Sequence, residues 1–134
     1  MIRGAIAFAG TAVVFGAMDA VWLTLTNAPL YRPTLAPLLA DQVRLVPAVL
    51  FYLIYLTGAV QFAVKPALLN GRWQSAAKLG AAFGFVAYAT YDLTNQATLK
   101  DWSTTITALD LGWGTFATAV ASTAGYFTVR ATKF

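Results

Sequence analysis

The sequence contains no cysteine and no histidine, all five of its acidic residues are aspartates, and only 10% of its residues are charged. Without cysteine there is neither a disulfide nor a thiol nucleophile, and without histidine there is no imidazole general base. The usual zinc sites, and the commonest axial ligand of haem or chlorophyll-type pigments, need the same two side chains. We therefore expect no haem, pigment or metal ligated by histidine or cysteine.

What the chain has in abundance is apolar surface. Its 134 residues are 59% hydrophobic, with a mean hydropathy of +0.65. An ordinary soluble domain is about one quarter charged, and a single domain of this length lacks the interior volume to bury so many apolar side chains. A bilayer acts as the apolar solvent for the outer face. The composition therefore predicts one membrane domain over residues 1–134, with membrane lipids as its partners.

Four stretches are long and apolar enough to cross a bilayer core roughly 30 Å thick, which takes about 20 helical residues. They cover residues 4–27, 47–64, 75–98 and 104–129. Helices satisfy their backbone polar groups within one segment, and none of the four stretches shows the alternation that a membrane barrel needs. The predicted fold class is an all-α integral membrane protein, a bundle of four transmembrane helices.

Prolines and turn signals separate these stretches. Three prolines between residues 29 and 37 are expected to break the chain after the first helix, and Lys65-Pro66 is expected to end the second. Leucines between Arg32 and Asp41 have a spacing that suits a short interfacial helix between the first two spans. The link at 99–103 is short, so the last two helices are expected to be antiparallel neighbours.

The nine cations predict the orientation, since Lys and Arg favour the cytoplasmic side. Six belong to the N-terminus, the second connection and the C-terminus: Arg3, Lys65, Arg72, Lys78, Arg130 and Lys133. Three belong to the other two connections: Arg32, Arg44 and Lys100. The excess predicts that both termini are cytoplasmic. Because the cations are scattered over segment ends, where they reach head groups, they do not indicate a nucleic-acid partner.

Three aspartates, Asp19, Asp92 and Asp110, fall inside the predicted spans. A charged residue at the centre of a transmembrane helix costs roughly 2.5–3.5 kcal/mol. At about 1.5 Å per residue, Asp92 and Asp110 each lie roughly 9 Å below the outer boundary, and Asp19 roughly 12 Å below it. We therefore expect three carboxylates at nearly one level, in the outer half of the membrane.

Aromatic and amide side chains share helix faces with these aspartates. Together they predict a polar pocket that opens toward the outer face. The candidates for a ligand or proton site are Asp19, Trp22, Tyr52, Tyr88, Asp92, Asn95, Asp110 and Trp113, with Arg44 and Lys100 as charge partners. No motif identifies a catalytic residue or a metal site.

Each feature also has a purely structural explanation. A single intramembrane aspartate is as well explained by an interhelical hydrogen bond as by function, and tryptophans near an interface are ordinary anchors. Gly80 and Gly84, with small residues at three- and four-residue steps from Gly114 to Gly125, indicate close helix packing within the monomer. The matched depth of three aspartates is what favours a functional site.

The run Tyr91-Asp92-Leu93-Thr94-Asn95, followed by Ala97, Lys100 and Trp102, resembles the bacterial membrane proteins grouped as domain of unknown function 2177. The resemblance extends to Asp19-Ala20-Val21-Trp22, Phe51-Tyr52, Gly58, Pro66, and Asp110 with Trp113-Gly114. The five-residue run is specific, and the shorter pieces are not. The resemblance implies a small four-helix protein of the bacterial inner (cytoplasmic) membrane and implies no activity.

Three functions fit these observations. The first is binding of, or action on, a small or lipid-like ligand, in which the aspartates would serve as acid and base, or hold a metal through oxygen, if a reaction is catalysed. The second is an accessory or assembly subunit of a larger photosynthetic or respiratory membrane complex. The third is a small proton- or cation-coupled carrier. The sequence leaves open whether the protein is an enzyme.

Overall fold

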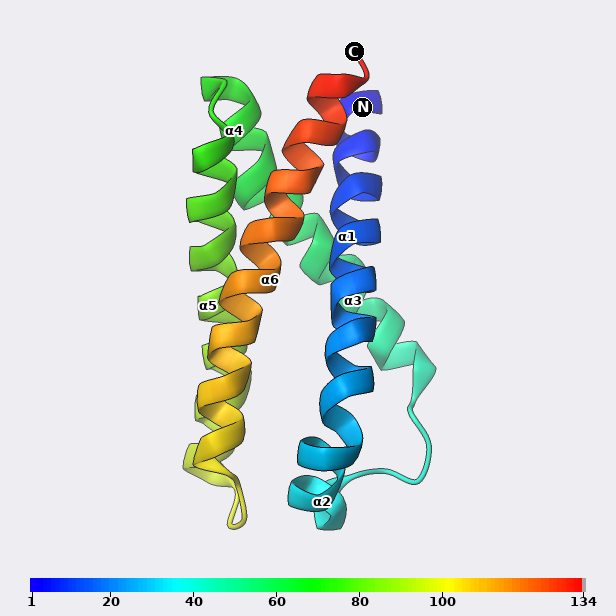
Figure 1. Cartoon of the computed structure of the whole chain (residues 1–134), viewed down its shortest axis with the longest axis vertical. Coiled ribbons are helices and arrows are strands. Elements are labelled where there is room, and N and C mark those ends of the chain that lie inside the picture. Colours follow the sequence, from blue (N-terminus) through cyan, green and yellow to red (C-terminus); the bar gives the residue numbers. More distant parts are fainter. Residues whose placement is uncertain (134) are drawn as a thin grey trace.

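The computed structural model describes residues 1–133, which form helices and turns and contain no strand (Figure 1). Four long helices make the bundle: α1 (Ile2–Thr26), α3 (Leu45–Ala59), α5 (Trp73–Thr98) and α6 (Thr104–Ala131). α5 and α6 form an antiparallel hairpin, α1 runs beside α6, and α3 crosses behind them. The start of α1, the end of α6 and the turn before α5 lie at one end of the bundle, which we call the terminal end.

The helix that begins at Leu45 does not end at Lys65-Pro66, so that prediction is wrong. It passes through the π-helical turn η3 (Val60–Val64) into α4 (Lys65–Asn70). In η3 the Lys65 N–H bonds to the carbonyl of Val60, five residues earlier. Pro66 thus falls in the first turn of the next α-helical segment, where its missing N–H breaks no hydrogen bond. The helix ends instead at Gly71, whose φ of 72° provides a left-handed cap.

The first helical path is also longer than predicted. After α1 it continues through the π-helical turn η1 (Asn27–Tyr31) into the single turn α2 (Arg32–Leu35) and the 3₁₀ turn η2 (Ala36–Leu38). The prolines therefore bend the path without ending it, because each falls in a segment with its own hydrogen-bond pattern. The short turn α2 stands where the sequence predicted an interfacial helix, with Leu35 buried and Leu38 exposed.

A seam of small residues holds α5 against α6. A Cβ atom added at Gly80 would lie 2.7 Å from both the Ser122 Oγ and the Thr118 carbonyl oxygen. One turn later, a Cβ atom at Gly84 would collide with the carbonyl of Gly114. The backbones are therefore in direct contact, which confirms that the small-residue pattern packs helices within the monomer.

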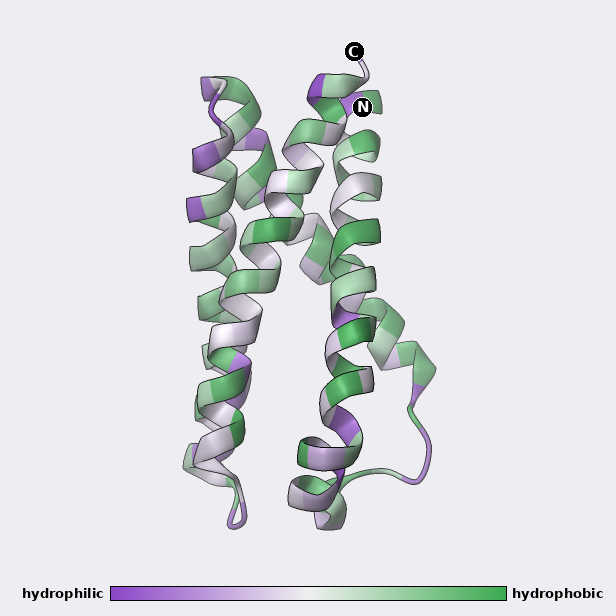
Figure 2. Ribbon diagram, in the orientation of Figure 1, coloured by the Kyte–Doolittle hydropathy of each residue, from purple (hydrophilic) through white to green (hydrophobic). Residues whose placement is uncertain are grey.

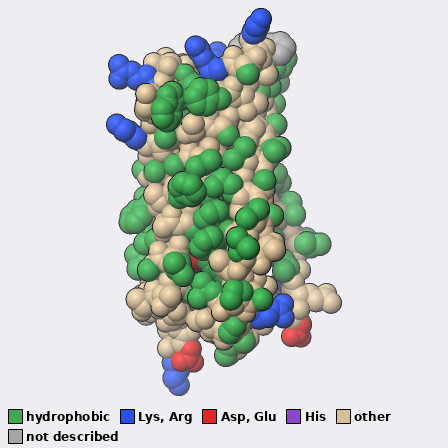
Figure 3. All heavy atoms as spheres, in the orientation of Figure 1, with side chains coloured by type: hydrophobic (Ala, Val, Ile, Leu, Met, Phe, Trp, Pro, Cys, Tyr) green, Lys and Arg blue, Asp and Glu red, His purple; other side chains and the backbone are tan. Residues whose placement is uncertain are grey.

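The apolar surface of the bundle faces outward. Two helical stretches within residues 1–133, Ile2–Leu38 and Leu45–Asn70, are long and apolar enough to cross a membrane, and only 17% and 22% of their most apolar windows are buried. A core helix of a soluble protein would be mostly buried. α5 and α6 are less apolar because their packed faces carry glycine, threonine, serine and aspartate. Figure 2 shows mainly hydrophobic residues along the middle of the bundle, and Figure 3 shows hydrophobic side chains there and Lys and Arg side chains at its two ends.

We expect Gly84→Ala to lower the free energy of unfolding by about 1–3 kcal/mol, the usual effect of overpacking a tight contact. The added methyl group would meet the Gly114 carbonyl and lie 2.7 Å from the Thr118 Cβ. Thermal and denaturant unfolding in detergent would measure the change. Gly112→Ala on α6 is the matched control, because a Cβ there meets nothing within 4 Å. Equal effects of the two substitutions would contradict the seam.

Candidate functional site

Two of the predicted aspartates meet where α5 packs against α6. Asp92 on α5 is 0% exposed and Asp110 on α6 is 9% exposed. Their carboxyl groups are close enough to interact with each other. An ionised carboxylate only accepts, so the two groups could share a hydrogen bond only when one of them holds a proton. Within the described residues, neither Asp92 oxygen has a hydrogen-bond donor.

A chain of hydrogen bonds connects Asp110 to α1. The Tyr31 hydroxyl, from η1, donates to Oδ1 of Asp110, and the Trp22 Nε1–H donates to the Tyr31 hydroxyl oxygen over 3.1 Å. The indole of Trp22 also stacks on that of Trp113, with ring centroids 4.5 Å apart and planes inclined by 8°. The two half-buried tryptophans thus join α1 to α6 beside the aspartate pair. Tryptophans that serve only as interfacial anchors would instead point to lipid.

Tyr31 is the main residue that sequence reasoning missed. Its place in the predicted connection after a proline break gives no reason to choose it as a site residue. Regular helical periodicity provides no signal either. Tyr31 follows Trp22 by nine residues, or about two and a half α-helical turns, so a regular helix would place the two side chains on opposite faces. The π-helical turn η1 changes that rotation and brings the tyrosine to Asp110.

Asp19 lies apart from this pair, on the side of α1 that faces α3. It is half-buried and accepts a hydrogen bond from the Tyr52 hydroxyl. Both residues line a groove of about 420 Å³ between α1 and α3, together with Phe15 and Leu56. Asp19 remains close enough for a Coulombic interaction with Asp110. The structure therefore brings two of the three carboxylates into contact and gives the third its own tyrosine partner.

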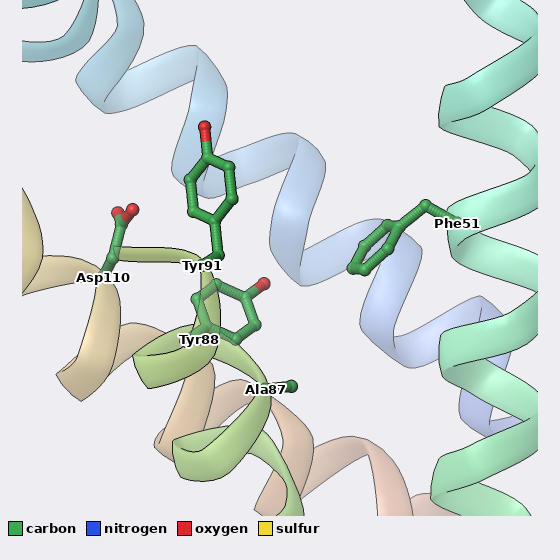
Figure 4. Close-up of a pocket in the computed structure, with 5 residues that line it drawn as sticks. All are labelled: Phe51, Ala87, Tyr88, Tyr91 and Asp110. Carbon is green, nitrogen blue, oxygen red and sulfur yellow. The ribbon is translucent and has the colours of Figure 1, made fainter. Parts of the chain in front are cut away.

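A cavity of about 280 Å³ adjoins the aspartate pair (Figure 4). It is lined by Phe51 from α3, by Ala87, Tyr88 and Tyr91 from α5, and by Asp110. In Figure 4, Phe51 faces α5 across the cavity, and the two tyrosines lie between Phe51 and Asp110. Phe51 and Tyr91 are 49% and 59% exposed, so the mouth of the cavity is at the surface of the bundle. The cavity has aromatic walls and a single carboxylate.

The other predicted residues take lesser positions. Asn95 is half-buried on α5, one turn beyond Asp92. Arg44 and Lys100 are exposed, and the hydrogen bonds to Asp19 and Asp110 come from tyrosine hydroxyls. No cluster of three or more aspartates that could hold a metal ion occurs in residues 1–133. The arrangement suits hydrogen bonding, proton sharing and the binding of an amphiphilic molecule.

We expect Tyr31→Phe to lower the free energy of unfolding by about 1–3 kcal/mol, because it removes a hydrogen bond to a buried carboxyl group and leaves Asp110 without that donor. Tyr126→Phe is the control: Tyr126 is buried where Tyr31 is half-buried, and within residues 1–133 its hydroxyl forms no hydrogen bond. Unfolding in detergent would compare the two. A Tyr31→Phe protein no less stable than the control would show that the bond to Asp110 does not stabilise the fold.

Comparison with known proteins agrees with the residue patterns. The family model described as "Predicted membrane protein (DUF2177)" matches residues 4–127. No curated protein and no solved structure matches the chain. The match covers α3 and α5 entirely and nearly all of α1 and α6. The chain therefore belongs to the DUF2177 family of predicted membrane proteins, as the run from Tyr91 to Asn95 predicted.

Proposed function

We propose that the protein is a four-span protein of the bacterial inner membrane that binds an amphiphilic, lipid-like ligand beside Asp92 and Asp110. Both termini are cytoplasmic in this proposal. The supporting observation is that Figure 3 shows positively charged side chains alone at the terminal end, and positive and negative side chains together at the opposite end. The six cations of the termini and second connection belong to segments at the terminal end (Figure 1).

Single cysteines test this topology directly, because the natural chain has none. We expect a membrane-impermeant thiol reagent to label Asp41→Cys and Asp101→Cys in intact spheroplasts. Gln74→Cys, at the terminal end, should be labelled only after the membrane is permeabilised. All three positions are exposed. Labelling of Gln74→Cys in intact spheroplasts, or protection of either aspartate position, would refute four spans with cytoplasmic termini.

The ligand site rests on one observation: a fully buried carboxyl group, Asp92, which has no hydrogen-bond donor within residues 1–133 and interacts with a second acid, Asp110. Burial of a charge without a compensating partner is expensive, and an apolar or amide side chain could fill this position at less cost. A fold that needed only an interhelical hydrogen bond would not require two facing acids. Destabilising pairs of this kind are typical of functional sites in membrane helices.

The cavity beside the pair selects the class of ligand. Phe51, Tyr88 and Tyr91 offer aromatic surface to an apolar group, while Asp110 accepts a hydrogen bond from, or attracts, a polar or cationic head. Access is from the side of the bundle, because the mouth lies between the outward faces of α3 and α5. An amphiphile dissolved in the membrane has a polar head and an apolar part that match this lining, and it can enter the cavity from the lipid.

Purification in mild detergent, followed by mass spectrometry of the retained lipids, tests this proposal. We expect the natural protein to retain one amphiphile preferentially. Asp110→Asn should weaken retention roughly 10- to 100-fold, the scale of a hydrogen bond to a charged group. Ala87→Leu should weaken it as well by filling the cavity, while Asp101→Asn in the exposed connection should retain the ligand as the natural protein does.

Asp92→Asn separates ligand binding from folding. Its amide N–H can donate to Asp110 in place of the carboxyl proton, so the bundle should stay folded while the shared proton is lost. Infrared spectroscopy should show a protonated carboxyl band in the natural protein and not in this variant. Equal lipid profiles in all variants would refute the ligand site. A stoichiometric protein partner that co-purifies while no amphiphile is retained would favour the accessory-subunit function instead.

A further inference from the structure

A second hollow lies near the terminal end, away from the aspartate pair. It is a groove of about 620 Å³ between the first turns of α1 and the segment formed by η3 and α4. Its polar lining consists of Arg3, Gln61 and Lys65, and its apolar lining includes Ala7, Leu68 and Leu69. No aspartate lines it. We call it the basic groove.

The basic groove combines two cations with an apolar floor. Arg3 is in the first turn of α1 and Lys65 is the first residue of α4, so tertiary packing brings together cations from distant parts of the chain. Both side chains are exposed, while Ala7 at the floor is fully buried. A Cβ at Gly4 would meet nothing within 4 Å, so the groove is open along α1.

We propose that the basic groove binds the head group of an anionic phospholipid. Arg3 and Lys65 hold the phosphate, Gln61 donates to an ester or glycerol oxygen, and the acyl chains continue along the exposed faces of Phe62 and Leu69. The occupant follows from charge complementarity and from the apolar walls, which a free phosphate would not use. The proposal rests on the membrane character of the family, and not on the function proposed for Asp110.

A neighbouring hollow provides an internal control. Arg72 and Lys78 line a depression of about 380 Å³ at the same end of the bundle, together with Gln74 and Ser75. Like the basic groove it carries two positive charges, but all four residues that line it are polar. General attraction to an anionic surface would involve both pairs of cations equally, whereas a specific lipid-binding site would involve only Arg3 and Lys65.

Native mass spectrometry from nanodiscs that contain dioleoylphosphatidylglycerol and dioleoylphosphatidylcholine tests the proposal. We expect the natural protein to retain phosphatidylglycerol in preference to phosphatidylcholine. The double variant R3Q/K65Q should lose about tenfold or more of this retention, since two basic residues near an anionic lipid are removed. The matched variant R72Q/K78Q should stay within about twofold of the natural protein. Soluble glycerol phosphate should not displace the lipid.

Gly4→Leu tests whether a loss of lipid in the double variant comes from a folding defect. It keeps both cations but fills the groove at a helical position with open space, so it too should lose phosphatidylglycerol while its melting temperature is unchanged. The proposal is overturned if Gly4→Leu retains the lipid, or if both charge variants lose it equally. Absence of any preference in the natural protein overturns it too, and displacement by glycerol phosphate would instead identify a free-phosphate site.

Discussion

The direct backbone contact between α5 and α6 is the constraint on which the rest of the structure depends. Lipid tails are as apolar as leucine, so helices in a membrane associate through close packing and polar contacts. Gly80, Gly84 and Gly114 permit that approach because they have no Cβ atom. The same approach forces Asp92 and Asp110 against each other in the adjoining turns. The packing seam and the candidate site are thus one continuous interface.

Two π-helical turns adapt the remaining helices to this interface. η1 brings Tyr31 onto Asp110, and with the Trp22–Trp113 stack it joins α1 to the α5–α6 pair. η3 carries the second helix past Pro66, so that Lys65 comes to line the basic groove. π-turns are rare in proteins and occur frequently at functional sites, because the extra residue redirects a side chain without breaking the helix. Here they shape both proposed binding sites.

Much of the fold could be predicted from the sequence, because its signals are local. Length and hydropathy indicated helices and a membrane environment, and the structure places α5 and α6 within two residues of the predicted 75–98 and 104–129. The run around Asp92 identified the family. Rise per residue predicted that Asp92 and Asp110 would share a depth, and the close packing of an antiparallel hairpin then brings them together. All of these inferences depend on local sequence patterns and on the regular geometry of a single helix.

By itself, then, the sequence determined an apolar helical protein with aspartates inside its long helices and small residues on the packed faces. Only the tertiary structure decided which groups meet: Tyr31 with Asp110, Tyr52 with Asp19, and Arg3 with Lys65 around one groove. The reason is geometric. A π-turn shifts the rotation of every residue after it, and a proline bends or ends a helix according to the hydrogen bonds around it, so faces cannot be extrapolated across either one.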